Sequence, residues 1–144
     1  MANGSVDSAH VDLPPAPAAA NPLRVLVVDD NTDAAMALNL WLQSLGHETR
    51  VANDGVAALK IAVEFQPDVV LLDIFMPYLD GYAVARRLRA LRMEKPLRIV
   101  AVTGWAEGTD RAKSREAGFD LHLVKPLDMT DLARALKRNT AVQP

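Results

Sequence analysis

The segment Val69–Pro77 reads VVLLDIFMP and decides the fold. Its four consecutive aliphatic residues lack polar alternation, which is typical of a parallel strand covered by helices on both faces. Asp73 follows this run, so we expect it at the carboxyl end of the strand, where open α/β sheets bind their ligands. Pro77 and then Asp80-Gly81 turn the chain before the next helix. The segment therefore predicts a carboxylate at a strand end, pointing toward solvent.

Working outward from this segment, short apolar runs alternate with helical patterns. Further strands are predicted at 25–28, 47–52, 97–102 and 120–124, the second of them at an edge of the sheet. Helices are predicted at about 34–45, 56–65, 82–92, 109–117 and 129–138. The fourth helix has little beyond alanine to bury, so it should be easily displaced. Five strands alternating with five helices predict a doubly wound parallel sheet with right-handed crossovers.

Length and composition restrict the class of protein. The 144 residues, half of them hydrophobic, suffice for one domain with a sizeable core. A net charge of -2 without a long basic run disfavours a nucleic-acid partner. The absence of cysteine excludes disulfides and thiolate chemistry. Because there is neither a membrane-length apolar run nor a secretory signal, we expect a cytoplasmic protein without a membrane partner.

Three regions are predicted along the chain. Residues 1–22 are rich in alanine and proline and should form a disordered leader, 23–139 a single folded domain, and 140–144 a disordered tail.

The third predicted helix carries Arg86, Arg87, Arg89 and Arg92, which we interpret as a solvated face rather than a binding site.

Polar side chains follow the other predicted strands. Asp29 and Asp30 come after the first strand, Thr103 after the fourth and Lys125 after the fifth. Parallel strands share one carboxyl edge, so these side chains should gather there with Asp73. Singly, the acids could be helix caps, the threonine a turn residue and the lysine a surface charge. Their occurrence together, at the ends of the right strands, indicates a site.

The predicted acid cluster requires a cation. Carboxylates about 6 Å apart repel by roughly 3 kcal/mol per pair at an effective dielectric constant near 20. Oxygen ligands suit Mg²⁺ or Mn²⁺, and Mg²⁺ commonly shares its remaining positions with a phosphate. A lysine and a threonine hydroxyl would complete a phosphoryl site by charge and by hydrogen bonding.

The chain resembles the receiver domain of two-component response regulators from about residue 24 to residue 138. The resemblance rests on Asp29-Asp30, Leu72-Asp73-Ile74-Phe75-Met76-Pro77, Asp80-Gly81, Thr103-Gly104 and Val124-Lys125-Pro126. It implies a flavodoxin-like fold with strand order 2-1-3-4-5 and helices on both faces. It also implies a phosphoacceptor signalling domain that catalyses only its own phosphorylation and dephosphorylation.

The resemblance also implies roles for single residues. Asp73 would accept a phosphoryl group from a histidine kinase or a histidine phosphotransfer protein. Mg²⁺ would be held by Asp30, Asp73 and the backbone carbonyl of Phe75, with Asp29 acting largely through water. Thr103 and Lys125 would grip the phosphoryl oxygens. A downstream protein would bind the face formed by the fourth helix, the fifth strand and the fifth helix, and a homodimer is possible.

Three residues depart from the family pattern. His122 occupies the place of an aromatic switch residue that works with the threonine, and we expect either a switch or an ordinary half-exposed histidine. Phe75 and Trp105 stand two residues after the phosphoacceptor and the threonine, where the family's faster members resemble one another in having polar side chains. We expect these two side chains to lengthen the lifetime of the phosphorylated form, although Trp105 could instead bind a partner.

Alternative functions remain open at this point. We expect a stand-alone receiver similar to a chemotaxis regulator, because no output domain follows the last predicted helix. A receiver excised from a hybrid histidine kinase would have the same sequence features. A phosphatase of the haloacid dehalogenase type also uses an aspartyl nucleophile and Mg²⁺, but it needs a second Asp two residues after the first, where this chain has Asn31 or Thr32. A flavin-binding module would need a glycine- and hydroxyl-rich loop after the first strand, and the loop here is acidic.

Overall fold

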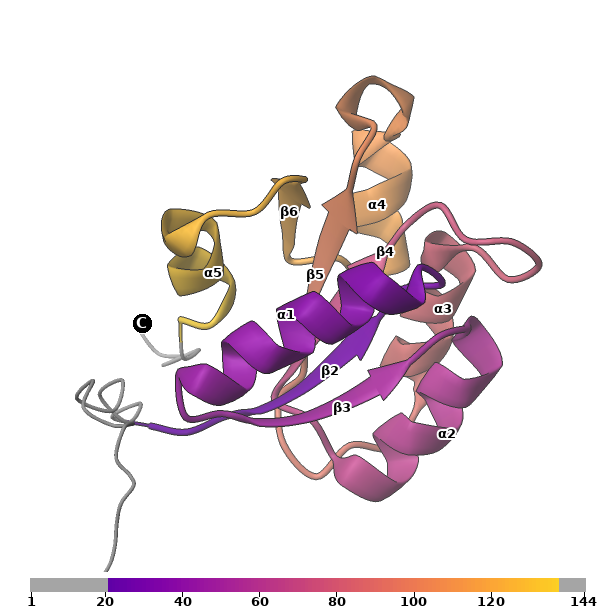
Figure 1. Ribbon diagram of the computed structural model, residues 1–144. Coiled ribbons are helices and arrows are strands. Elements are labelled where there is room, and N and C mark those ends of the chain that lie inside the picture. The colour runs from indigo at the N-terminus through magenta and orange to yellow at the C-terminus, as the bar shows by residue number, and fades with distance from the viewer. Residues whose placement is uncertain (1–20, 138–144) are drawn as a thin grey trace, which may run out of the picture.

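The structure is a computed structural model that describes residues 21–137. Five parallel strands of this region form one sheet in the order β3-β2-β4-β5-β6 (Figure 1). They are β2 (Arg24–Val28), β3 (Glu48–Ala52), β4 (Val69–Asp73), β5 (Arg98–Thr103) and β6 (Leu121–Val124). When these five strands are numbered from one in chain order, their order in the sheet is 2-1-3-4-5. The predicted fold class is therefore confirmed. The predicted tail, and all but two residues of the predicted leader, lie outside the described residues.

Helices cover both faces of the sheet. Those described are α1 (Thr32–Ser44), α2 (Gly55–Phe65), α3 (Gly81–Ala90), α4 (Arg111–Ala117) and α5 (Met129–Ala135), with a short 3₁₀ helix η1 (Ala106–Gly108). α1 and α5 lie on one face, and α2, α3 and α4 lie on the other (Figure 1). In residues 21–137 no helix has the length and apolar character that a membrane span requires.

Asparagine and aspartate side chains define where the helices begin. Each helix cap accepts a hydrogen bond from the backbone N–H three residues later, and the caps are Asn31, Asp54, Asp80, Asp110 and Asp128. Because Asn31 caps α1, the carboxylates that precede it in the chain are free for other contacts. The cap of α4 also makes that helix start two residues later than predicted, after η1.

Two apolar clusters pack against the two faces of the sheet. All five residues of β4 are buried, as expected for a central strand covered on both faces.

α3 packs closely against the end of β4. A Cβ built on Gly81 would lie 2.7 Å from the Asp73 carbonyl oxygen and 2.5 Å from the Ile74 Cα. A glycine at the first position of α3 therefore brings this helix against the segment that carries Asp73.

Candidate functional site

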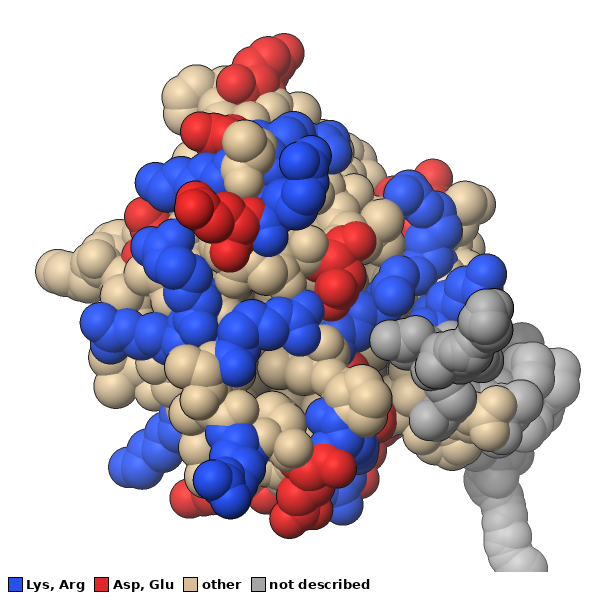
Figure 2. Space-filling view, turned by 180° about the vertical axis from the view of Figure 1, so that it is seen from behind, with Lys and Arg blue, Asp and Glu red and all other residues tan. Residues whose placement is uncertain are grey.

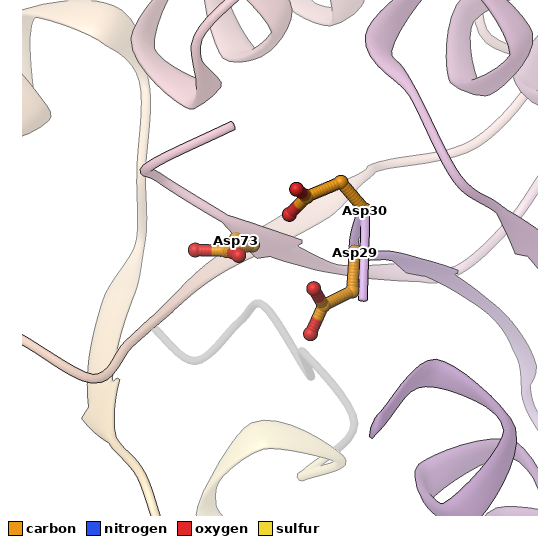
Figure 3. Close-up of side chains that lie close together, drawn as sticks. All are labelled: Asp29, Asp30 and Asp73. Atoms are coloured by element: carbon orange, nitrogen blue, oxygen red, sulfur yellow. The ribbon is translucent and has the colours of Figure 1, made fainter. Parts of the chain in front are cut away.

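Three carboxylates meet at the carboxyl edge of the sheet. Asp73 is the last residue of β4, while Asp29 and Asp30 follow the neighbouring strand β2, which pairs with β4 in register. Oxygen atoms from the three side chains all lie within 4.8 Å of one another (Figure 3). Asp29 and Asp73 are buried, whereas Asp30 is exposed. The cluster is thus open to solvent on the side of Asp30.

Asp29 is held by contacts from three parts of the chain. Its carboxylate accepts hydrogen bonds of 2.9 Å from the Asn31 backbone N–H and of 2.9 Å from the Lys125 ammonium. Its backbone carbonyl accepts a bond of 3.0 Å from the side-chain amide of Asn53. Asn53 is not among the site residues predicted from the sequence. Its position directly after β3, at the same edge of the sheet, was the available signal.

Asp73 is 8% exposed, and its carboxyl group lies in an environment that disfavours its charge. Burial raises its pKa to about 6, the nearby Lys125 ammonium acts to lower this pKa, and the Asp29 carboxylate raises it further. One carboxylate oxygen accepts a hydrogen bond of 3.1 Å from the Phe75 backbone N–H. A positive charge placed in the cluster would therefore stabilise the ionised form of Asp73.

The donor set fits a hard divalent cation. Three carboxylates within one small space supply the oxygen ligands that Mg²⁺ and Mn²⁺ take, and the exposed Asp30 leaves room for water ligands. Asp29, Asp30 and Asp73 are the residues that would hold the ion. The predicted contribution of the Phe75 carbonyl stays a prediction.

Thr103 and Lys125 reach the same edge from β5 and β6. Thr103 is the last residue of β5 and is buried, and its hydroxyl oxygen accepts a bond of 3.0 Å from the Trp105 backbone N–H. Lys125 follows β6, and its backbone N–H donates to the Thr103 carbonyl at 2.8 Å. Its ammonium group neutralises Asp29 in this structure. The hydroxyl hydrogen of Thr103 remains available for a further acceptor.

His122 lies in β6 on the side of the sheet that α4 covers. Its ring is 5.9 Å from the ring of Phe119, and its Nε2 is buried without a hydrogen-bond partner among residues 21–137. Burial lowers the pKa of His122, and the nearby Arg111 of α4 lowers it further. The imidazole is thus partly enclosed beneath α4, where a change in its rotamer would affect that helix.

The two unusual aromatic residues meet at the rim of the site. The rings of Phe75 and Trp105 are 5.5 Å apart and tilted by 43°, and their residues are 40% and 59% exposed. Gly108 of η1 lies directly against the indole, because a Cβ built there would be 2.5 Å from its Cδ2. The pair therefore connects the β4–α3 and β5–α4 segments across the surface next to Asp73.

Known proteins share this architecture. "Transcriptional regulatory protein PrrA" of Mycobacterium tuberculosis is 40% identical over 114 residues, which are 79% of this chain and 48% of that protein. The chain thus spans about half the length of the curated relatives it matches. A CheY-like response regulator receiver domain from Methylobacillus flagellatus superposes with a TM-score of 0.72 at 32% identity, covering 79% of this chain and 95% of that one.

A third similar protein is described with a metal ion. The receiver domain of the sensor histidine kinase PA1611 from Pseudomonas aeruginosa has a magnesium ion coordinated in its active site cleft. It superposes with a TM-score of 0.70 at 32% identity, covering 79% of this chain and 93% of that one.

The strand order, together with acids, a hydroxyl and a lysine at the carboxyl edge, defines an α/β domain of the receiver type. The chain belongs to the response regulator receiver domain family, whose model matches residues 25–137. It is therefore a receiver domain of two-component signalling, a class of signalling domain that is generally not enzymatic. Membership of this family sets aside the phosphatase and flavin-binding alternatives.

Proposed function

We propose that this domain accepts a phosphoryl group on Asp73 from a histidine kinase or a histidine phosphotransfer protein, and that it signals by a change of conformation. The observation that carries the proposal is the position of Asp73. It ends the buried central strand, its carboxylate shares a cluster with Asp29 and Asp30, and the Lys125 ammonium lies nearby. The proposed domain comprises residues 23–139.

In the proposed transfer, a carboxylate oxygen of Asp73 attacks the phosphorus of a phosphohistidine. A P–O bond forms, the P–N bond breaks, and the released imidazole nitrogen takes up a proton. Mg²⁺ or Mn²⁺, when bound, would withdraw negative charge from the phosphoryl oxygens. The Lys125 ammonium would leave the Asp29 carboxylate and pair with a phosphoryl oxygen. The Thr103 hydroxyl would donate a hydrogen bond to a second phosphoryl oxygen.

The proposed output is a protein contact on the face formed by α4, β6 and α5. Thr103, moving toward the phosphoryl group, and His122, beneath α4, would connect the site to this face. PrrA is named as a transcriptional regulator and PA1611 as a sensor histidine kinase, so a receiver of a longer regulator or of a hybrid kinase fits as well as a stand-alone one. The absence of a nucleic-acid partner and a cytoplasmic location stay predictions.

Phosphorylation itself is tested with a small phosphodonor. Incubation with acetyl phosphate and Mg²⁺ should add the mass of one phosphoryl group to the wild type and to Asp33→Asn, a matched control in the exposed first turn of α1. The Asp73→Asn variant should stay unmodified. Equal modification of Asp73→Asn would show that another residue is the acceptor.

The metal site is tested by thermal unfolding. Because the empty acid cluster is repulsive, Mg²⁺ at about 100 times its dissociation constant should stabilise the fold by roughly 2.7 kcal/mol. The melting temperature of the wild type should therefore fall when a chelator replaces Mg²⁺. The Asp30→Ala variant should lose this difference. Identical melting curves of the wild type in both buffers would contradict a metal site.

A further inference from the structure

An open groove runs between α3 and α4, on the face of the sheet away from α1. Its volume is about 720 Å³, and it is lined by Arg86, Asp110, Ala112, Lys113, Arg115 and Glu116. Figure 2 shows that Lys and Arg side chains gather on this side of the molecule, with acidic side chains between them. Exposed Arg87 and Arg111 lie on the same two helices. None of the residues that line this α3–α4 groove belongs to the carboxyl cluster.

The cations of the α3–α4 groove form no ion pairs in the part of the chain that the structure describes. Within residues 21–137, no carboxylate lies within 4.0 Å of the charged nitrogens of Arg86, Lys113 or Arg115. Arg89, one residue of the same helix, is different. It pairs with Asp120 at 2.7 Å and donates to the carbonyls of Leu97 and Gly118. Arg89 thus stabilises the fold through these contacts, whereas the cations that line the groove make no comparable ion pairs within the described residues.

The groove is fixed at both ends by polar contacts. Near the start of α4, the Tyr82 hydroxyl accepts a hydrogen bond of 3.0 Å from the Asp110 backbone N–H, and the Lys113 ammonium lies 4.7 Å from the centre of the Tyr82 ring. After the end of α4, the Arg89 guanidinium donates to the Gly118 carbonyl at 2.6 Å. These contacts hold α4 against α3 in this structure, whereas the exposed cationic side chains would be ordered when a ligand binds.

The balance of charge in the groove selects the kind of partner. Of its two acids, Asp110 accepts the Lys113 backbone N–H as the cap of α4 and keeps its negative charge, so three cations face two carboxylates in the groove. Glu116 has no such role and interrupts the row of cations. A continuous polyanion such as DNA would meet this carboxylate along its length, whereas a peptide can place a neutral side chain there. The chain as a whole carries a net charge of -2, so the positive groove is a local feature.

We propose that the α3–α4 groove is a docking surface for an acidic segment of a partner protein. Carboxylates of the segment would pair with Arg86, Lys113 and Arg115, and a neutral residue would face Glu116. This docking needs no phosphoryl group and no metal ion, so it stands or falls separately from the function proposed for Asp73. The arginines of α3, interpreted from the sequence as a solvated face, become in part a binding surface.

The test uses the full chain and a fluorescein-labelled peptide of glutamates interrupted by single glutamines, called oligoglutamate below, which can place a neutral residue against Glu116. Fluorescence anisotropy at low ionic strength should show binding that weakens as salt is added, because exposed ion pairs are screened. An oligoglutamine peptide should not bind, and a single-stranded oligonucleotide of equal length should bind more weakly than oligoglutamate. Equal binding of oligoglutamine, or tighter binding of the oligonucleotide, would overturn the proposal.

Matched variants locate the binding site. Arg86→Gln combined with Arg115→Gln should weaken oligoglutamate binding by about threefold to thirtyfold, as expected for two exposed ion pairs. Arg134→Gln combined with Lys137→Gln changes the net charge equally but acts on or next to α5, across the sheet, and should have little effect. Glu116→Gln should tighten binding. If the two double variants lose affinity equally, or Glu116→Gln weakens binding, the groove is not the docking surface.

Discussion

Asp73 combines two properties that oppose each other in a folded protein. It ends a fully buried strand, which fixes its position, but burial and the neighbouring Asp29 destabilise its charge. A carboxyl group with a raised pKa stabilises the fold only while it is protonated. At neutral pH without metal, the ionised side chain therefore reduces the free energy of unfolding. We therefore expect Asp73, the proposed phosphoacceptor, to lower the stability of the metal-free protein.

The first prediction follows from the sign of this pKa shift. The pKa of Asp73 is about 6 in the folded state and 3.8 when unperturbed, so the destabilisation develops between these pH values and is complete above them. Asp73→Asn should raise the free energy of unfolding at pH 8 by on the order of 2 kcal/mol. The gain should disappear below pH 4. Urea unfolding in chelator at both pH values measures this, and an Asp73→Asn variant less stable than the wild type at pH 8 would contradict it.

The residues brought together at the sheet edge could largely be predicted from the chain. Asp73 and Thr103 end apolar strands, and the three other site residues follow such strands: Asp29, Asp30 and Lys125. A parallel sheet puts such positions at one edge. The contacts among them could not be predicted, because partner choice depends on side-chain rotamers. The Lys125–Asp29 ion pair, at 2.9 Å, is one example.

At the level of elements, the contact between α3 and β4 depends on Gly81. Its Cα faces the backbone of Asp73 and Ile74 with no room for a side chain. Backbone atoms cannot rotate out of the way as flexible side chains can, so any Cβ here must push α3 away from the strand. The Asp80-Gly81 pair thus both caps α3 and permits its close packing.

The second prediction compares two glycines. Gly81→Ala should destabilise the fold by about 1–3 kcal/mol, the usual effect of overpacking. Gly104→Ala is the control, because a Cβ built on Gly104 meets no atom within 4 Å. That variant should change stability by less than about 0.5 kcal/mol. Urea unfolding of both variants measures the difference, and equal stability would mean that α3 adapts at no cost.

The third prediction concerns the loops that follow β4 and β5, which carry Phe75 and Trp105. Hydrolysis of a phosphorylated Asp73 needs a water molecule oriented in line with the bond to phosphorus. Neither aromatic side chain can accept a proton from this water, because phenyl has no polar atom and the indole N–H is only a donor, and we expect the pair to exclude part of the water next to Asp73. Positioning and proton acceptance by one polar group is typically worth about 10²- to 10⁴-fold, and Thr103 and Lys125, which remain in place, would reduce the effect.

Phe75→Asn, Trp105→Glu and the double variant should therefore lose the phosphoryl group faster than the wild type at fixed Mg²⁺. The Val124→Thr variant is a control, because it changes an exposed apolar side chain at the end of β6. Decay of the phosphorylated proteins, followed by mass, gives the rates. A double variant that decays no faster than the wild type would show that these aromatics do not set the lifetime.

Strands were more predictable than helix ends. The apolar runs of β2, β4 and β5 favour buried strands over buried helices because they are short and rich in β-branched residues. The start of α4 was placed too early, since the Asp110 cap and the 3₁₀ turn before it are determined by local hydrogen bonds. α5 ends at Ala135, three residues before its predicted end.

At the scale of the whole molecule, the helices that cover the sheet are anchored unequally. α1 packs through buried Leu42 and partly buried Leu38 and Trp41, whereas α4 contributes only Ala117 to the apolar core. The other buried side chain of α4 is Ser114, whose hydroxyl has no hydrogen-bond partner in residues 21–137. An unpaired buried polar group costs about 1–3 kcal/mol. A shift of α4 would therefore lose few apolar contacts and could relieve this cost.

The last prediction is that binding of a phosphoryl analogue at Asp73 changes the environment of α4 more than that of the far end of α1. Thr103 ends β5, and α4 follows in the chain, so a displacement of its hydroxyl toward the analogue pulls on the segment that leads into the least anchored helix. His122, whose buried Nε2 also lacks a partner within the described chain, lies beneath that helix and can turn as the helix moves. Beryllofluoride with Mg²⁺ should change the amide chemical shifts of residues 107–117 and of His122 more than those of residues 38–44. Thr103→Ala should reduce the changes in α4 while leaving those next to Asp73. Shift changes confined to the immediate neighbours of Asp73 would show that the analogue binds without moving the α4 face.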